Sequence, residues 1–158
     1  MSTSAAKRRQ EEKQAQLRTA GAKEFWAFTA RLCVLNESER LLEIKSGFSA
    51  HLFQAMRLTF NLPEGNLTIL LNASIPTFEQ RLREHQALDT VVSERLDRIA
   101  CVAHQTEEVF ESQDAAAQWM SRPNKALGGA EPILLCETEI GTKQVRRVLN
   151  ALGWGGTA

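Results

Sequence analysis

Apolar residues recur at intervals of three and four along this 158-residue sequence, and no segment shows a credible strand-like alternation. The observed spacing places apolar side chains on one stripe of a helix, whereas a half-buried strand needs a repeat of two. The longest such stretch runs from about Val91 to Phe110. The predicted fold class is therefore all-α, with a helix-turn-helix domain followed by a small helical domain.

The composition allows a buried core but gives the chain no overall charge with which to attract nucleic acid. Hydrophobic residues make up 43% of the sequence and the formal net charge is zero, so any DNA contact must come from a local patch. No apolar run approaches the roughly 20 residues that span a bilayer. The N-terminus lacks the apolar segment of a secretory signal. We therefore expect a cytoplasmic protein without membrane contact.

Residues 1–24 are rich in Lys, Arg, Gln and Ala and contain almost no large apolar side chain. Through Lys23 the segment carries six basic residues against two acidic ones, and it cannot bury enough surface to hold itself in place. It is predicted to be a flexible or helical arm, either solvated or touching phosphates. Next, Phe25, Trp26, Phe28 and Leu32 share one helical stripe, which indicates core packing or a homodimer contact.

Residues 25–110 are predicted to form a DNA-binding and dimerisation domain around a helix-turn-helix. The first helix would run from Pro63 to Leu71 and the recognition helix from Ile75 to Glu84, joined by a three-residue turn. Gln side chains can read adenine and Arg side chains can read guanine, although the same geometry also occurs as plain packing. Ser74 is a good N-cap for the second helix, and Asp89-Thr90 is expected to cap the long helix that follows. The residues predicted to contact DNA are Ser74, Thr77, Gln80, Arg81 and Arg83, of which the last four are expected to face outward.

Residues 111–158 are predicted to form short helices joined by tight turns. Gly128 and Gly129 indicate a turn, because glycine permits backbone angles closed to other residues. Pro132 suits the first position of a helix, and Thr138 suits the N-cap of the last one. Along that last helix the predicted inner stripe is Val145, Val148, Leu149 and Leu152, the predicted open face is Lys143, Arg146 and Arg147, and Gly153 is the end.

This C-terminal segment resembles the toxin-binding domain of Xre/MbcA/ParS antitoxins. The shared order is Trp119-Met120, Pro123-Asn124, Ala126-Leu127-Gly128-Gly129, Pro132, Leu135, Thr138, Gly141, Val145, Leu149 and Gly153. Upstream, the helix-turn-helix resembles that of Xre-family antitoxins at Gly47-Phe48, Ala73-Ser74, Thr77-Phe78 and Arg81. It departs from their pattern at Gln80, where Arg is usual, and at Phe78, where Leu is usual.

The resemblance implies an antitoxin that forms a homodimer, represses its own operon by binding operator DNA, and neutralises a cognate RES-domain toxin. An alternative partner is a ParT-type toxin; both kinds resemble ADP-ribosyltransferases and use NAD, and the antitoxin covers the NAD pocket. Another alternative is a transcription regulator of a different system. The residues predicted to contact the toxin are Lys143, Arg146, Arg147, Gly153 and Trp154. Those predicted to be structural are Trp119, Pro123, Leu127, Gly128, Gly129 and Pro132.

Catalytic and metal-binding motifs give little support for an enzyme. The chain has no Gly-rich phosphate loop, HExxH pair or Gly-x-Ser-x-Gly elbow, so we expect a non-enzyme without a cofactor. Cys33, Cys101 and Cys136 lie far apart in the sequence and are interpreted as free thiols. Cys101 and His104 are three residues apart, but the sequence offers no second pair of metal ligands to go with them, so no metal site is expected.

Overall fold

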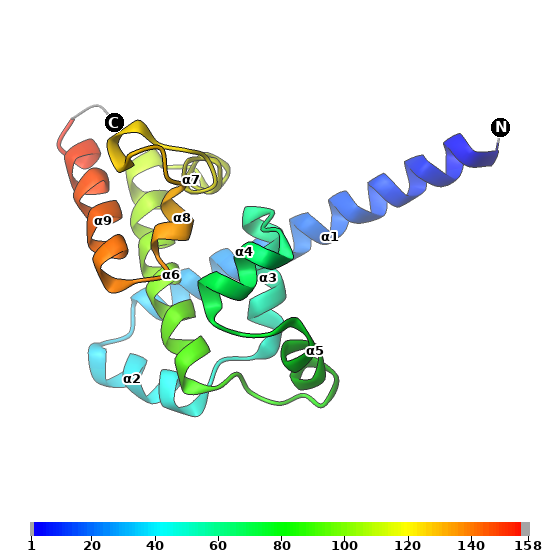
Figure 1. Ribbon diagram of the computed structural model, residues 1–158, viewed down its shortest axis with the longest axis horizontal. Helices are drawn as coiled ribbons and strands as arrows, with labels where there is room; N and C mark the ends of the chain where they lie inside the picture. Colours follow the sequence, from blue (N-terminus) through cyan, green and yellow to red (C-terminus); the bar gives the residue numbers. More distant parts are fainter. Residues whose placement is uncertain (1, 156–158) are drawn as a thin grey trace.

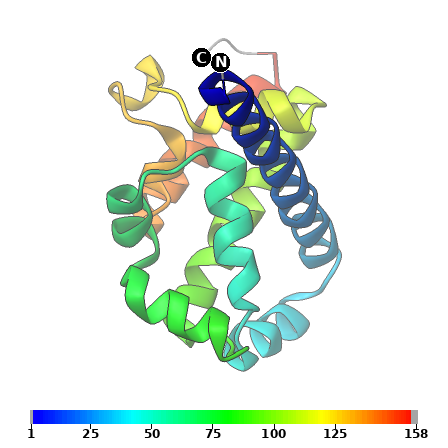
Figure 2. The same cartoon turned by 90° about the vertical axis from the view of Figure 1, so that its right-hand side faces the viewer.

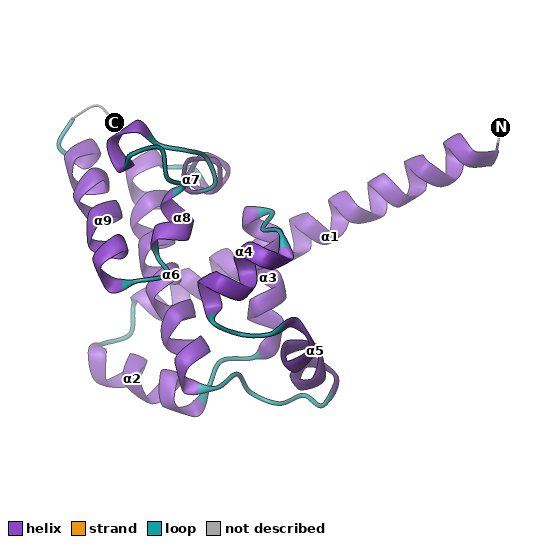
Figure 3. Cartoon of the chain, viewed as in Figure 1, coloured by secondary structure: helices purple, strands orange, loops and turns teal. Residues whose placement is uncertain are grey.

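The structure is a computed structural model that describes residues 2–155, and within that range the chain is all-α, as predicted (Figure 3). Only two isolated β-bridges, Ser49 with Ala87 and Asn124 with Ala130, interrupt the helices and loops of this part. The α-helices are α1 Ser2–Cys33, α2 Glu37–Ser46, α3 Ala50–Phe60, α4 Glu64–Leu71, α5 Ile75–Arg83, α6 Thr90–Phe110, α7 Gln113–Met120, α8 Pro132–Leu135 and α9 Glu139–Gly153, with a 3-10 turn at Lys125–Leu127.

Helix α6 forms the centre of the molecule (Figure 1). Asp89 caps its N-terminus, where the carboxylate accepts a hydrogen bond of 2.9 Å from the Val92 amide. Along its length α6 contacts α1, α2 and α4 as well as α7 and α9. Its buried residues, among them Leu96, Ile99 and Ala103, belong to one core that continues into the C-terminal helices. The predicted domain boundary after residue 110 falls at the end of this shared helix and stays a prediction.

The N-terminal arm is the outer part of α1, which projects from the body of the molecule (Figures 1 and 2). Residues 3–20 are all exposed. The helix enters the core only near Gly21, where it packs on α3 beside Leu58. The aromatic stripe that follows is core: Phe25 is 0% exposed and its ring lies edge-on to Phe60 of α3, with 5.2 Å between centroids. Core packing therefore explains this stripe.

The predicted helix-turn-helix elements are present as α4, a turn at residues 72–74 and α5. Asn72 ends α4 in the left-handed conformation with φ of 52°, and Ser74 caps α5 by accepting the Thr77 amide. The sequence predicts that Phe78 packs the two helices of this motif together, but it did not indicate a contact with α3. Phe78 stacks on Phe53 of α3, with 3.6 Å between ring centroids, so α3 forms part of the support for the recognition helix.

No helix between residues 2 and 155 combines the length and the hydropathy required to cross a membrane.

Candidate functional site

The C-terminal module is α7, the 3-10 turn, α8 and α9, and its most regular element is α9. Thr138 caps this helix as predicted, with its hydroxyl oxygen accepting the Gly141 amide at 3.0 Å. Val145 and Leu149 are completely buried against α6 and the module, and Val148 and Leu152 are half-buried at the sides of the same stripe. The helix therefore presents its opposite side to solvent.

That opposite side is a mixed apolar and cationic surface, which we call the α9 outer face. At 3.6 residues per turn its members fall on one side of the helix, and all of them are exposed: Ile140, Lys143, Gln144, Arg147, Ala151 and Trp154. Ile140 is 73% exposed and Trp154 is 93% exposed. No ion pair within residues 2–155 involves Lys143 or Arg147. A face with two bare apolar ends and two unneutralised cations is suited to binding another protein.

The structure separates the five predicted toxin-contacting residues. Lys143, Arg147 and Trp154 share the α9 outer face, whereas the helical spacing places Arg146 and Gly153 off it. Arg146 is half-buried, so the prediction that it shares the open face with Lys143 and Arg147 was wrong. Its positive charge lies close enough to the Cys136 sulfur to oppose the rise in that thiol's pKa to about 12, which burial causes. Ile140 was not predicted to contact the toxin, although its spacing from Lys143 and Arg147 in the sequence places it on the same side of the helix.

The segment between α7 and α8 is a closed turn built on Asn124. Its amide donates to the Ala130 carbonyl at 3.0 Å, and its carbonyl accepts the Gly129 amide at 2.8 Å. Gly128 and Gly129 have φ of 68° and 84° with open space around them, so their role is conformational, as expected. Leu127 is half-buried against the core.

Trp119 is also only half-buried, because it lies at the edge of the module. Its ring is 5.8 Å from that of Phe110, and both line a surface groove of about 430 Å³ together with Pro123, which is exposed. Pro132 is the first residue of α8, the position that suits proline, and its side chain is buried. Of the six residues predicted as structural, Pro132 is buried and the other five are half-buried or exposed.

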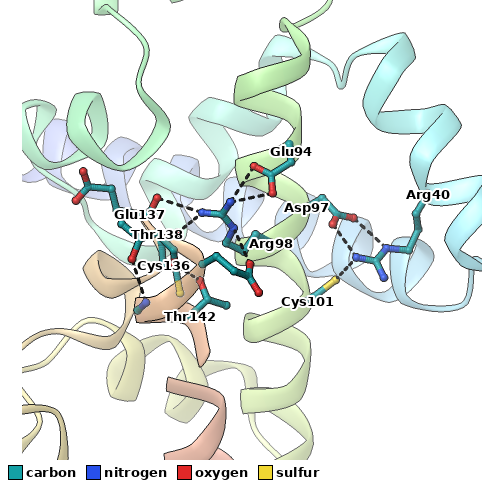
Figure 4. A network of polar contacts seen from close by, with 11 residues as sticks. Arg40, Glu94, Asp97, Arg98, Cys101, Cys136, Glu137, Thr138 and Thr142 are labelled. Atoms are coloured by element: carbon teal, nitrogen blue, oxygen red, sulfur yellow. Dashed lines mark hydrogen bonds and ion pairs between the residues drawn. The ribbon is translucent and has the colours of Figure 1, made fainter. Parts of the chain in front are cut away.

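One arginine that the sequence did not single out fixes α9 to α6. The Arg98 guanidinium donates to the carbonyl oxygens of Cys136 and Glu137 at 3.2 and 3.1 Å, and to both carboxylate oxygens of Glu94 at 2.9 and 3.0 Å (Figure 4). The two carbonyls belong to the turn between α8 and α9, where helix ends leave acceptors without partners. Arg98 thereby sets where α9 begins.

The predicted DNA-contacting residues lie on or beside α5. Thr77, Gln80 and Arg83 are placed on this helix, and all three are exposed. The Ser74 hydroxyl is engaged in the cap and donates to the Thr77 hydroxyl at 2.7 Å. Arg81 is half-buried, and its guanidinium donates to the Ala87 carbonyl at 2.7 Å. The prediction that Arg81 faces outward was therefore wrong, because the loop after α5 folds back against it.

Comparison with known proteins identifies the family of the C-terminal module. Residues 105–155 match the family model "Antitoxin Xre/MbcA/ParS C-terminal toxin-binding domain". An "Antitoxin Xre" of Yersinia enterocolitica is 33% identical over 115 residues, which cover 71% of this chain and 76% of that protein. This chain belongs to the Xre antitoxin family. The family module starts inside α6, so the antitoxin's central helix contributes to it.

Two further relatives of this Xre-family antitoxin differ in how much they align. An "Antitoxin Xre" of Pseudomonas putida is 32% identical over 79 residues, which span 50% of each protein. A "Prs ADP-ribosylating antitoxin" of Sphingobium sp. is 26% identical over 129 residues, covering 76% of this chain and 81% of that protein. The Yersinia and Sphingobium alignments therefore include more of the chain than the C-terminal module alone.

In this Xre-family antitoxin, Arg98→Ala is expected to lower the free energy of unfolding by about 2 kcal/mol. The change removes charge-assisted bonds to carbonyls that have no helical partner. Urea denaturation measures the loss. The matched control is Arg31→Ala, which removes the exposed pair with Glu43 and should cost less than about 1 kcal/mol. Equal losses for the two variants would contradict the role given to Arg98.

Proposed function

We propose that this protein binds and neutralises an NAD-consuming toxin, covering the toxin's active site with the α9 outer face. The observation that carries the proposal is the side-by-side exposure of Lys143, Arg147 and Trp154 on a helix whose other side is fixed in the core. A rigid helix needs little ordering on binding. The protein acts by binding rather than by catalysis, in the cytoplasm, where NAD and its own operon are found.

The chemistry of the α9 outer face suits the mouth of an enzyme pocket. Trp154 offers a large apolar anchor, and tryptophan and arginine are enriched among residues that dominate binding energy. Arg147 can form two parallel hydrogen bonds with a carboxylate at the pocket. Ile140, at the other end of the face, extends the apolar contact. A toxin with an acidic, partly apolar rim around its NAD site is the partner that these groups fit.

A RES-domain toxin is the first candidate, because two of the relatives are named Antitoxin Xre. The alternative is a toxin of the ParT or ADP-ribosylating type. It is supported by the Sphingobium relative, whose name is Prs ADP-ribosylating antitoxin and whose alignment covers 76% of this chain. The two classes differ in the fate of NAD: one degrades it, and the other transfers its ADP-ribose to an acceptor.

The test is to mix the purified chain with the product of the neighbouring gene and follow NAD. We expect NAD loss to stop near molar equivalence of the two proteins. Undiminished NAD loss at a large excess of the chain would overturn the neutralising role. Labelled NAD separates the toxin classes, because only an ADP-ribosylating toxin leaves the label on protein or another acceptor. If no neighbouring gene encodes an NAD-consuming protein, the alternative role as a transcription regulator of a different system would be favoured.

A second function, repression of its own operon, is favoured by the geometry of α4 and α5. Helix α5 is held by Phe78 against α3 and leaves Thr77, Gln80 and Arg83 exposed. The second helix of such a motif lies in the major groove, and paired half-sites are usually read by a dimer. We therefore propose that a homodimer binds the operator through α5, with the cationic arm of α1 close to phosphates.

The double change Gln80→Ala and Arg83→Ala is expected to weaken operator binding at least tenfold and to leave toxin neutralisation intact. A side chain that reads a base is worth about 1–3 kcal/mol of discrimination, and α5 lies outside the C-terminal module. Band shifts with the upstream DNA measure the first effect, and the NAD assay measures the second. Glu79→Ala, an exposed neighbour on α5, is the control. Operator binding unchanged in the double variant would exclude α5 as the reading helix.

A further inference from the structure

Two of the three cysteines, which are 68 positions apart, meet in the fold. Cys33 is the last residue of α1 and Cys101 lies in the middle of α6, and these two helices pack together. The two thiols are close enough for each to shift the pKa of the other. Both are half-buried, so small solutes can reach them. The sequence had indicated isolated thiols, because nothing in the local spacing brings α1 against α6.

A polar cluster surrounds Cys101 (Figure 4). The Arg40 guanidinium of α2 donates to the Cys101 sulfur at 3.0 Å. It is held in place by two bonds to the Asp97 carboxylate, one of 3.0 Å from Nε and one of 2.6 Å from Nη2. His104 lies one turn beyond Cys101 on α6 and adds positive charge near Cys33 when it is protonated. Arginine, aspartate and histidine therefore all face the thiols.

The cluster assigns different roles to the two sulfurs. The hydrogen bond from Cys101 is the main cause that lowers the pKa of Cys33 to about 7, with help from the charges of His104 and Arg40 and against the effect of burial. The pKa of Cys101 is raised because its proton is held in that hydrogen bond and because it is buried. At neutral pH Cys33 is thus substantially a thiolate, the nucleophilic form, and Cys101 is a thiol beside it.

We propose that Cys33 and Cys101 form a redox modification site, which a hydroperoxide converts to a reversible disulfide between α1 and α6. The Cys33 thiolate attacks one oxygen of hydrogen peroxide, the O–O bond breaks, and hydroxide leaves. Cys33 becomes a sulfenic acid. The Cys101 sulfur then attacks the Cys33 sulfur, the S–O bond breaks, and the Cys101 proton leaves with that oxygen as water. Two sulfurs lose two electrons to one peroxide; a dithiol reductant reverses the change.

Cys136 provides an internal control. It is 0% exposed, its thiol faces the Pro132 carbonyl at 3.5 Å, and burial raises its pKa to about 12. A buried neutral thiol without a thiol neighbour reacts slowly with peroxide. The three cysteines also fall in separate tryptic peptides, residues 32–40, 99–125 and 126–143, since trypsin does not cut between Arg122 and Pro123.

The experiment treats the reduced full-length chain at neutral pH with about one equivalent of hydrogen peroxide, blocks free thiols, and maps peptides without reduction. We expect two of the three thiols to be oxidised, with peptide 32–40 joined to 99–125 and peptide 126–143 blocked as a free thiol. The linked chain should run as a monomer and regain all its thiols with dithiothreitol. Cys136 reacting as fast as Cys33, or links that only join separate chains, would overturn the proposal.

The pairing of the two thiols is tested by Cys101→Ala in a Cys136→Ala background, with helix content followed by circular dichroism. In the parent the pH midpoint for alkylation of Cys33 should lie at about 7. Removing the hydrogen-bond donor should move this midpoint upward, toward the ordinary thiol value of 9.0. Peroxide should then stop at a sulfenic or higher acid on Cys33. An unchanged midpoint in a folded variant would show that the two thiols are not partners.

Discussion

Gly141→Ala is expected to lower the free energy of unfolding by about 3 kcal/mol, because backbone fills the space that the methyl group needs. A Cβ at this position would lie 2.0 Å from the Leu135 carbonyl oxygen and 2.9 Å from its carbonyl carbon. The first turn of α9 would have to move away from the end of α8. Urea denaturation should show the loss, and toxin neutralisation should fall with it, because α9 would no longer be fixed against α6.

Gly153→Ala is the matched control, in the same helix. Its added Cβ would have Val109 as its nearest neighbour at 4.0 Å, which is an ordinary contact. Alanine is the better helix former, so this change should raise stability by about 0.5 kcal/mol. A loss of stability at Gly141 no larger than the change at Gly153 would show that the close approach between α8 and α9 does not constrain this position.

Trp154→Ala is expected to weaken toxin binding by about 2 kcal/mol, or roughly thirtyfold in Kd, with little effect on folding. The side chain is 93% exposed and so contributes little to the core. Reversing both cations, as Lys143→Glu with Arg147→Glu, should weaken binding further and slow association. Calorimetry or surface plasmon resonance with the toxin gives Kd, and thermal unfolding of the free chain verifies the fold.

Controls for the α9 outer face are available elsewhere on the molecule. Val34, between α1 and α2, is 82% exposed, and Lys45 of α2 is exposed as well. Val34→Ala and Lys45→Glu remove the same kinds of group from another surface and should leave Kd unchanged. If these variants weaken the complex as much as the changes on α9, the toxin does not bind where we propose.

Local signals predicted the helices well because their causes are local. The N-caps Ser74, Asp89 and Thr138 are all present, and α5 and α6 begin within one residue of the expected positions. Caps and apolar spacing act within one or two turns of chain, so a single sequence carries them. The all-α fold class followed from the same signals.

The interactions that position the candidate sites join distant segments, which is why the sequence missed them. Arg98 binds carbonyls 38 and 39 residues away, and Arg40 binds Asp97 across 57 residues. The exposure of Arg81 was also predicted wrongly, because the loop after α5 folds back and contacts its side chain. The α9 outer face was partly predictable, because Ile140 shares helical spacing with Lys143 and Arg147.

The central position of α6 has a thermodynamic consequence for the two binding functions. The helix supplies apolar side chains both to the N-terminal half and to the C-terminal module, within one continuous core. A partner that binds only the folded form stabilises everything that unfolds together with its site. A toxin bound to α9, as we propose, would therefore also stabilise α5, so that occupancy of one surface would set how rigidly the other is presented.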